Sequence, residues 1–218
     1  MRELLQADFR RVLKDKLLIV MGILAVAFAV ITPALYAVIM GFVGTEDPIV
    51  GEMLATSFSA KGMFFNAFLI GDNLGLVAPI LLVIVLWKDF SYGTVRNKII
   101  SGKSRQAIFF SMFCVSSVVL IATMLFHAFA TLGFRLIFFD YQADPFVAAD
   151  FWYLIESVFF EILVLLTVSA ILSWLCAVMK NLGVVIVMYV AISFLLAIAS
   201  GIISVIMMVL ETLEGNEL

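Results

Sequence analysis

Five long apolar runs dominate this sequence and constrain its fold more than any other feature. A helix needs about 20 predominantly apolar residues to cross the hydrocarbon core of a bilayer. The chain is 65% hydrophobic and only 13% charged, whereas about a quarter of the residues in a soluble domain are charged. Its mean hydropathy is +1.21. The pattern therefore predicts an all-α, polytopic membrane helical bundle with spans at 17–43, 63–87, 106–134, 152–179 and 182–210.

Lysine and arginine lie almost entirely on one side of these spans. Five are in the first sixteen residues, five are in residues 88–105 and one is Lys180, whereas only Lys61 and Arg135 fall on the other side. Cytoplasmic segments of membrane proteins carry an excess of lysine and arginine, so we expect the N-terminus, residues 88–105 and Lys180 to be cytoplasmic. Five spans then place the acidic tail outside. We expect no signal peptide, because the first apolar run exceeds the roughly 7–15 residues of a signal core.

Residues 1–16 are charged and amphipathic. In a helix, the apolar residues of this segment share one face, whereas most of its basic residues lie elsewhere. The sequence therefore predicts an interfacial helix at 1–16 that lies in the membrane surface, followed by a transmembrane domain at 17–218. The alternative is a charged segment that only fixes the topology. The predicted apolar face consists of Leu5, Phe9, Val12, Leu13 and Leu17.

The most polar long stretch is residues 88–105, KDFSYGTVRNKIISGKSR, between the second and third predicted spans. Gly93 permits a turn, Thr94 is a candidate N-cap, and Gly102 can end a helix at the C′ position, with Ser104 available to start the next span. We therefore expect a helix of about two turns that lies parallel to the membrane. Its mixed apolar and basic surface suits docking into a groove of another protein. The alternative is a loop that contacts only lipid headgroups.

Other functions find little support in the sequence. The segment NKIISGKS approaches the phosphate-loop pattern G-x-x-x-x-G-K-[ST], but Asn97 stands where the first glycine is needed, and no strand precedes it. Cys114 and Cys176 form no metal-binding spacing, and no nucleophile has a base at a recognisable spacing. We therefore expect no enzymatic activity, metal or cofactor in this chain itself. We also expect no nucleic-acid binding, because the basic patch is small and membrane-bound.

The segment Trp87–Arg105 reads W-K-D-F-x-x-G-T-x-R-N-K-I-x-x-G-x-S-R and resembles the signature of bacterial type-2 ATP-binding-cassette (ABC) permeases. The resemblance implies that a coupling helix within residues 89–103 lies in a groove of a separate ATPase subunit, which binds ATP and Mg²⁺. It extends over the layout of the whole chain and is most specific at Asp89, Gly93, Thr94, Arg96, Gly102, Ser104 and Arg105. The residues that it implies at the ATPase contact are Asp89, Phe90, Tyr92, Gly93, Thr94, Arg96, Asn97, Ile99, Gly102 and Arg105.

The resemblance also implies a function. The chain would be the permease subunit of an ATP-driven ABC exporter in the bacterial plasma membrane, paired with a second copy of itself or with a related permease. It would form the pathway for a hydrophobic or amphipathic substrate such as a peptide, toxin or antibiotic, while ATP is hydrolysed in the partner subunit. Members of this family usually have six spans, with short re-entrant helices before the sixth, whereas this sequence shows five.

Polar groups inside the predicted spans are candidates for the substrate pathway, because a charge in the bilayer is costly. The candidates are Asp72, His127, Glu156, Glu161 and, among the many phenylalanines, Phe68. Glu161 could line a water-filled cavity or be protonated and packed against a polar neighbour. Asp72 could lie near the headgroups, and His127 could be a hydrogen-bonded packing residue. The alternative functions are an ion-coupled secondary transporter that uses Asp72, Glu156 and Glu161, and a non-transporting immunity or assembly protein of the membrane.

Overall fold

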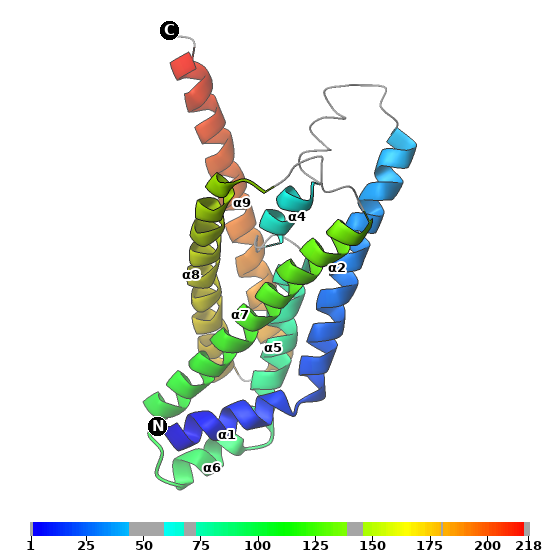
Figure 1. Cartoon of the computed structure of the whole chain (residues 1–218). Coiled ribbons are helices and arrows are strands. Elements are labelled where there is room, and N and C mark those ends of the chain that lie inside the picture. The colour runs from blue at the N-terminus through cyan, green and yellow to red at the C-terminus, as the bar shows by residue number, and fades with distance from the viewer. Residues whose placement is uncertain (1, 44–58, 68–72, 139–145, 180, 216–218) are drawn as a thin grey trace.

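The structure is a computed structural model that describes residues 2–43, 59–67, 73–138, 146–179 and 181–215. No strand occurs in these ranges, so the all-α prediction is confirmed for them. The helices are α1 (Arg2–Leu13), α2 (Lys16–Val43), α4 (Ala60–Asn66), α5 (Asn73–Ser91), α6 (Thr94–Ile100), α7 (Arg105–Phe138), α8 (Ala148–Val178) and α9 (Leu182–Gly215). The long helices form a bundle, with α1 and α6 together at one end and α4 toward the other (Figure 1).

Five helices in the described part of the chain are long and apolar enough to cross a membrane. This finding agrees with the predicted number of spans and indicates a membrane-embedded protein. Their apolar windows are Lys16–Leu35 in α2, Leu74–Ser91 in α5, Arg105–Ile137 in α7, Asp150–Val178 in α8 and Leu182–Ile203 in α9.

The second span differs from its prediction. The apolar run predicts one helix over 63–87, but α4 ends at Asn66, and the spanning helix α5 begins only at Asn73. Phe64 of α4 is buried in a small apolar cluster with Ala128 of α7. The prediction was wrong because apolar composition alone does not distinguish a short buried helix from part of a spanning one.

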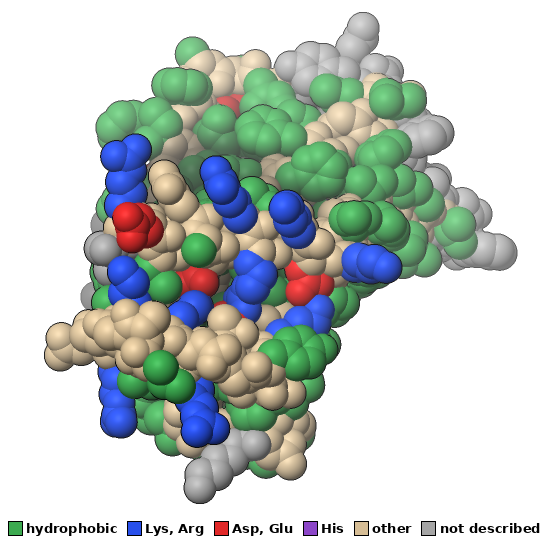
Figure 2. All heavy atoms as spheres, turned by 90° about the horizontal axis from the view of Figure 1, so that it is seen from below, with side chains coloured by type: hydrophobic (Ala, Val, Ile, Leu, Met, Phe, Trp, Pro, Cys, Tyr) green, Lys and Arg blue, Asp and Glu red, His purple; other side chains and the backbone are tan. Residues whose placement is uncertain are grey.

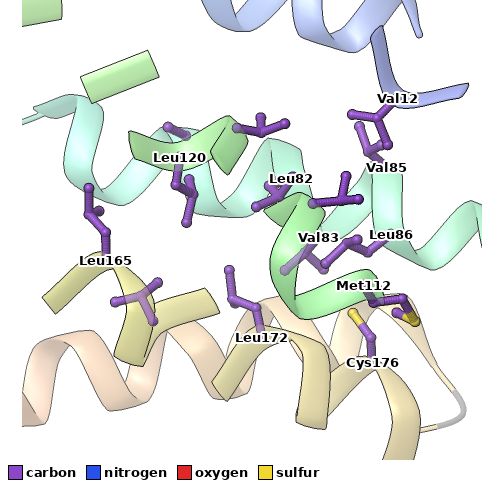
Figure 3. Packing of buried hydrophobic residues seen from close by; sticks show 14 of the residues in the cluster. Val12, Leu82, Val83, Val85, Leu86, Met112, Leu120, Leu165, Leu172 and Cys176 are labelled. Carbon is purple, nitrogen blue, oxygen red and sulfur yellow. The ribbon is translucent and has the colours of Figure 1, made fainter. Parts of the chain in front are cut away.

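The main apolar core lies between α5, α7 and α8. Leu82 and Leu86 of α5, Leu120 of α7 and Leu172 of α8 belong to one cluster and are at most 1% exposed. Figure 3 shows these side chains pointing into the space that the helices enclose. The exposed outer faces of the same helices are apolar as well, which is the composition expected of helices that are surrounded by lipid.

Buried polar contacts between spans determine which helix faces meet. Ser116 Oγ of α7 lies 3.4 Å from Ser173 Oγ of α8, and Tyr189 Oη of α9 donates to the carbonyl of Gly75 in α5 at 3.1 Å. Lipid is as apolar as a leucine side chain, so small residues and interhelical hydrogen bonds decide the packing of spans. Among the side chains of α9 that the structure describes, only Val185 and Tyr189 are buried.

The amphipathic segment at the N-terminus is helical, and it packs in part through the predicted face: Val12 is buried, and Phe9 and Leu17 pack against the main core. The fully buried row nevertheless differs from the predicted one. Leu4, Asp8 and Val12, spaced by four residues, are buried against the bundle, whereas Leu13 of the predicted apolar face is 63% exposed. An acid therefore occupies the middle of the buried row. Its carboxylate has partners on other helices, and these contacts turn Asp8 toward the bundle, where the apolar pattern alone predicts no acid.

A glycine with a positive φ lies on each side of α6. Gly93 is the N-cap residue with φ 69°, so the prediction of Thr94 as N-cap was wrong, because the chain turns through a left-handed conformation that glycine adopts without strain. Gly102 follows the helix with φ 82°. The N–H of Gly102 donates to the carbonyl of Ile99 at 3.0 Å, and the N–H of Lys103 donates to the carbonyl of Lys98 at 3.1 Å. This is a Schellman motif, and it confirms the predicted C′ glycine.

The next helix begins as the sequence predicts. Ser104 Oγ accepts the N–H of Ala107 at 3.2 Å, and α7 starts at Arg105. The connection from α6 to α7 therefore consists of only a few residues, and nearly every one of them has a defined hydrogen bond. This arrangement fixes the direction of α6 relative to the spans.

We expect Gly102→Ala to lower the free energy of unfolding by about 1 kcal/mol, because an L-residue in the left-handed region is strained by roughly that amount. A Cβ at this position would meet no atom within 4 Å, so the cost is conformational only. The measurement is thermal unfolding of the purified protein in detergent micelles. The control is Gly201→Ala in α9, where a Cβ also meets open space and φ is not positive. Equal Tm values for the two variants would contradict the left-handed conformation of Gly102.

Candidate functional site

The exposed surface of α6 is the most distinctive feature of the end of the bundle that carries α1. α6 buries none of its side chains. Tyr92, just before it, and Ile100, at its end, are 76% and 74% exposed, and Arg96 and Asn97 are exposed beside them. Figure 2 shows lysines and arginines spread over the face at this end. Large apolar side chains exposed together outside the spans are typical of a surface that contacts a partner.

The residues that the resemblance implies at an ATPase contact differ in exposure: some face the bundle and others face outward. Asp89 is 1% exposed, and Phe90 packs against the main apolar core, so both lie on the inner side. Gly93 and Thr94 are half-buried. The exposed members of the set are Tyr92, Arg96, Asn97, Ile99, Gly102 and Arg105.

Asp89 belongs to a largely buried group of charged and polar side chains, here called the ionic network, which consists of Asp8, Arg11, Asp89, Lys98 and Ser111. Its carboxylate pairs with the guanidinium of Arg11 in α1, and Lys98 Nζ of α6 lies 3.8 Å from its second oxygen. A buried carboxylate needs such partners because an isolated charge away from water is costly. Asp89 therefore holds α1 and α6 against the end of α5 from the inside.

Asp8 of α1 completes the ionic network. Its Oδ1 accepts from Lys98 Nζ, and its Oδ2 accepts from Ser111 Oγ of α7, both at 2.6 Å. The side chains of Lys98 and Asp8 are only 12% and 6% exposed, and charge-assisted hydrogen bonds of this kind are short and strong. One lysine of α6 thus contacts acids from two other helices.

Sequence reasoning missed Asp8, Arg11 and Ser111 as site residues. A signal for Asp8 was present, because it lies four residues after Leu4 and four before Val12, and an acid between two buried apolar positions requires a partner. Arg11 and Ser111 carry no comparable signal, because their partners lie on helices that are distant in sequence.

A second ion pair lies where α1 turns into α2. Lys88 Nζ, near the end of α5, donates to both carboxylate oxygens of Asp15 at 2.6 and 2.8 Å, and the N–H of Leu17 donates at 3.0 Å. Partial burial alone would raise the pKa of Asp15. Donation from Lys88 and Leu17 and the charges of Lys88 and Arg11 outweigh it, and they hold the pKa of Asp15 below its ordinary value of 3.8. Asp15 therefore stays ionised at neutral pH.

The candidates inside the spans do not form one site with α6. His127 is 1% exposed, and its Nδ1 lies 2.9 Å from the carbonyl oxygen of Ala25 in α2, so it joins α7 to α2. Glu156 is exposed on α8. Asp72 and Phe68 lie outside the described residues.

Glu161 of α8 is turned toward α7. It is 8% exposed, and its carboxylate makes no ion pair with another residue in the described ranges. It lies beside Met124 and Leu125 at a cavity of about 10 Å³, which is at most the space of a single water molecule. Glu161 is therefore surrounded by apolar side chains in this conformation, and the small cavity gives it little contact with water. The described residues include no cluster of three or more metal-ligating side chains.

We expect Asp89→Ala to lower the free energy of unfolding by about 3 kcal/mol or more, because removal of one partner leaves the other charges of a buried pair uncompensated. The measurement is chemical unfolding in mixed micelles. The control is Glu3→Gln, because Glu3 is 91% exposed and its carboxylate lies 4.0 Å from Lys103. Exposed pairs of this kind contribute little. An Asp89→Ala protein as stable as the Glu3→Gln control would refute the ionic network.

We expect the Asp15–Lys88 pair to make stability depend on acid pH. Because the folded pKa of Asp15 lies below its ordinary 3.8, the pair contributes fully above that value and is lost as pH falls through the folded pKa. The measurement is Tm against pH for the wild type and for Asp15→Asn. The difference between the two should shrink as the pH falls below 3.8, and a difference that stays constant over this range would argue against the pair.

Comparisons with family models, with curated proteins and with solved structures give no match to this chain. A function is therefore inferred from the surface of α6 and from the ionic network that holds it.

Proposed function

We propose that this chain is the permease subunit of an ATP-driven ABC exporter and that α6 is its coupling helix, which docks into a groove of a separate ATPase subunit. The observation that carries the proposal is that α6 exposes apolar and basic side chains on its outer surface and is bound to the bundle by ion pairs on its inner side. Arg96 and Ile100 of α6 and Tyr92 just before it are exposed, while Lys98 of the same helix is bound by Asp8 and Asp89. A helix that only marked membrane topology would not need both.

The outward surface has the composition of a protein-binding anchor. Interface hot spots are enriched in tyrosine and arginine, and they combine a buried apolar anchor with a charged rim. Here Tyr92, Ile99 and Ile100 supply the apolar area, and Arg96 and Arg105 supply the charge. Ile100 was not in the contact set implied by the resemblance, and its 74% exposure adds it to the proposed contact.

The ionic network supplies a route by which movement of α6 would reach the spans. Lys98 contacts α1 through Asp8 and the end of α5 through Asp89, and Ser111 at the start of α7 donates to the carboxylate of Asp8. Coupling between distant sites requires contiguous contacts between rigid elements. We assign Asp8, Asp89 and Lys98 the role of positioning residues, which would transmit force from a bound ATPase without touching it.

The remaining parts of the proposal follow from the same assignment. The end of the bundle with α1 and α6 would face the cytoplasm of a bacterial cell, as its concentration of lysine and arginine favours. The subunit would pair with a second copy or a related permease and export a hydrophobic or amphipathic substrate such as a peptide, toxin or antibiotic. ATP and Mg²⁺ would bind only in the ATPase partner.

The test is to co-express the tagged chain with the genes that neighbour its own and to quantify the ATPase that co-elutes. We expect the wild type to retain an ATPase and Ile100→Asp to retain at least about tenfold less, because a central apolar anchor contributes about 2 kcal/mol or more to an interface. The matched control is Ile137→Asp at the far end of α7, since Ile137 is also 74% exposed. A chain that elutes alone, or equal retention by both variants, would count against the proposal.

A further inference from the structure

An open apolar groove lies between α1, α2 and α7, apart from the surface of α6. Figure 1 shows these three helices bounding one region, with α1 below, α2 rising beside it and α7 crossing toward α2. The groove has a volume of about 250 Å³. Its lining consists of Phe9, Val12 and Leu13 of α1, Leu18 and Gly22 of α2, and Val118, Val119, Ala122, Thr123 and Phe126 of α7.

Helical spacing and small residues create the groove. Val118, Ala122 and Phe126 follow one another at intervals of four and so form a continuous stripe along α7. Gly22 and Ala122 contribute almost no side chain, and a Cβ placed on Gly22 would meet no atom within 4 Å. Val118 and Phe126 remain 50% and 51% exposed, so the groove opens sideways at the surface of the bundle.

The lining offers nothing to a polar ligand. Thr123 carries the one side-chain hydroxyl among the lining residues, and it donates to the carbonyl of Val119 in its own helix at 2.8 Å. Every other lining side chain is apolar. An unfilled hollow of this kind loses van der Waals contacts along its walls. Because the groove opens between two spans, the apolar material that reaches it in a bilayer is a lipid acyl chain.

Basic residues with no acid partner lie next to groove-lining residues in the sequence. Arg10, Lys14 and Lys16 are exposed and make no ion pair with an acid in the described part of the chain. Lys14 directly follows the lining residue Leu13, and Lys16 begins α2 just before Leu18. Lys14 and Lys16 thus lie at the turn between α1 and α2, next in the sequence to segments that line the groove, and a phosphate headgroup at this end would meet positive charge.

We propose that this groove binds one acyl chain of an anionic phospholipid from the leaflet that contains α1, with the phosphate held by Lys14 and Lys16. The acyl chain fills the hollow above Gly22 and Ala122, and the headgroup charge meets the unpaired cations. Acyl chains are interchangeable between the groove and the bilayer, so the headgroup provides the selectivity. The site requires no ATPase and does not depend on the proposed export function.

The test is native mass spectrometry of the full chain, released from nanodiscs that contain equal amounts of phosphatidylglycerol and phosphatidylcholine with identical acyl chains. We expect the wild type to retain one phosphatidylglycerol in preference to phosphatidylcholine. Gly22→Leu and, separately, Ala122→Leu fill the groove and should abolish this preference. The matched control is Gly133→Leu on α7, where a Cβ also meets open space outside the groove lining, and it should behave as the wild type does.

The headgroup contact is tested separately. Lys14→Gln and Lys16→Gln should each reduce the preference for phosphatidylglycerol by about fivefold, because a cation near an anionic surface contributes about 1 kcal/mol. Lys103→Gln, beside Glu3 near the start of α1, is the control for loss of a cation elsewhere and should leave the preference unchanged.

Each other outcome contradicts the lipid site. Equal retention of the two lipids by the wild type would show that the groove does not select an anionic headgroup. An unchanged preference in both Gly22→Leu and Ala122→Leu, with loss in the lysine variants, would place the lipid on the basic face outside the groove. A wild-type dimer without lipid that Gly22→Leu converts to a monomer would identify a second copy of the chain as the occupant.

Discussion

The ion pairs between Lys98 and two buried acids, Asp8 and Asp89, determine the arrangement of this end of the molecule. A helix of seven residues cannot maintain itself in isolation, because nucleation of a helix is costly and few hydrogen bonds follow it. α6 has no fully buried side chain, although Val95 packs in part against the main apolar core. Its position therefore depends on these ion pairs and on the left-handed turns at Gly93 and Gly102, with Val95 adding an apolar contact. The consequence is a short helix whose outer surface is free for a partner.

The spanning helices are held together by other interactions than the ion pairs that hold α6. In lipid, apolar burial contributes little to the association of helices, so close packing and a few polar contacts decide which faces meet. The hydrogen bonds of His127 with Ala25 and of Tyr189 with Gly75 are contacts of this kind, and each joins helices that are far apart in the sequence. The ionic network lies at the end of the bundle, where α1 and α6 cover it and where the side chain of Arg11 is still 35% exposed. The same charges in the middle of a span would be far more costly.

The sequence was sufficient to predict features that depend on local composition. Apolar runs predicted five spans, and Gly102 and Ser104 marked the end of one helix and the start of another, as the structure has them. The sequence was insufficient where contacts between distant segments determine where a helix ends or which way a side chain faces. The division of the second run at Asn66 follows from packing of α4 on α7. The inward position of Asp89 follows from Arg11, which is far away along the chain. The resemblance to ABC permeases had instead implied that Asp89 lies at the contact with the ATPase.

α1 connects the two sites that we propose. One of its rows, Leu4, Asp8 and Val12, is buried and carries the ionic network, while Phe9 and Leu13 face the groove between α2 and α7. A lipid in that groove would contact the helix that holds Lys98 and, through it, α6. Displacement of α1 by one ligand would therefore change the free energy of binding at the other, since coupling of this kind is reciprocal. The twelve residues of α1 would thus serve two contacts, because its buried row carries the ionic network and Phe9 and Leu13 line the groove.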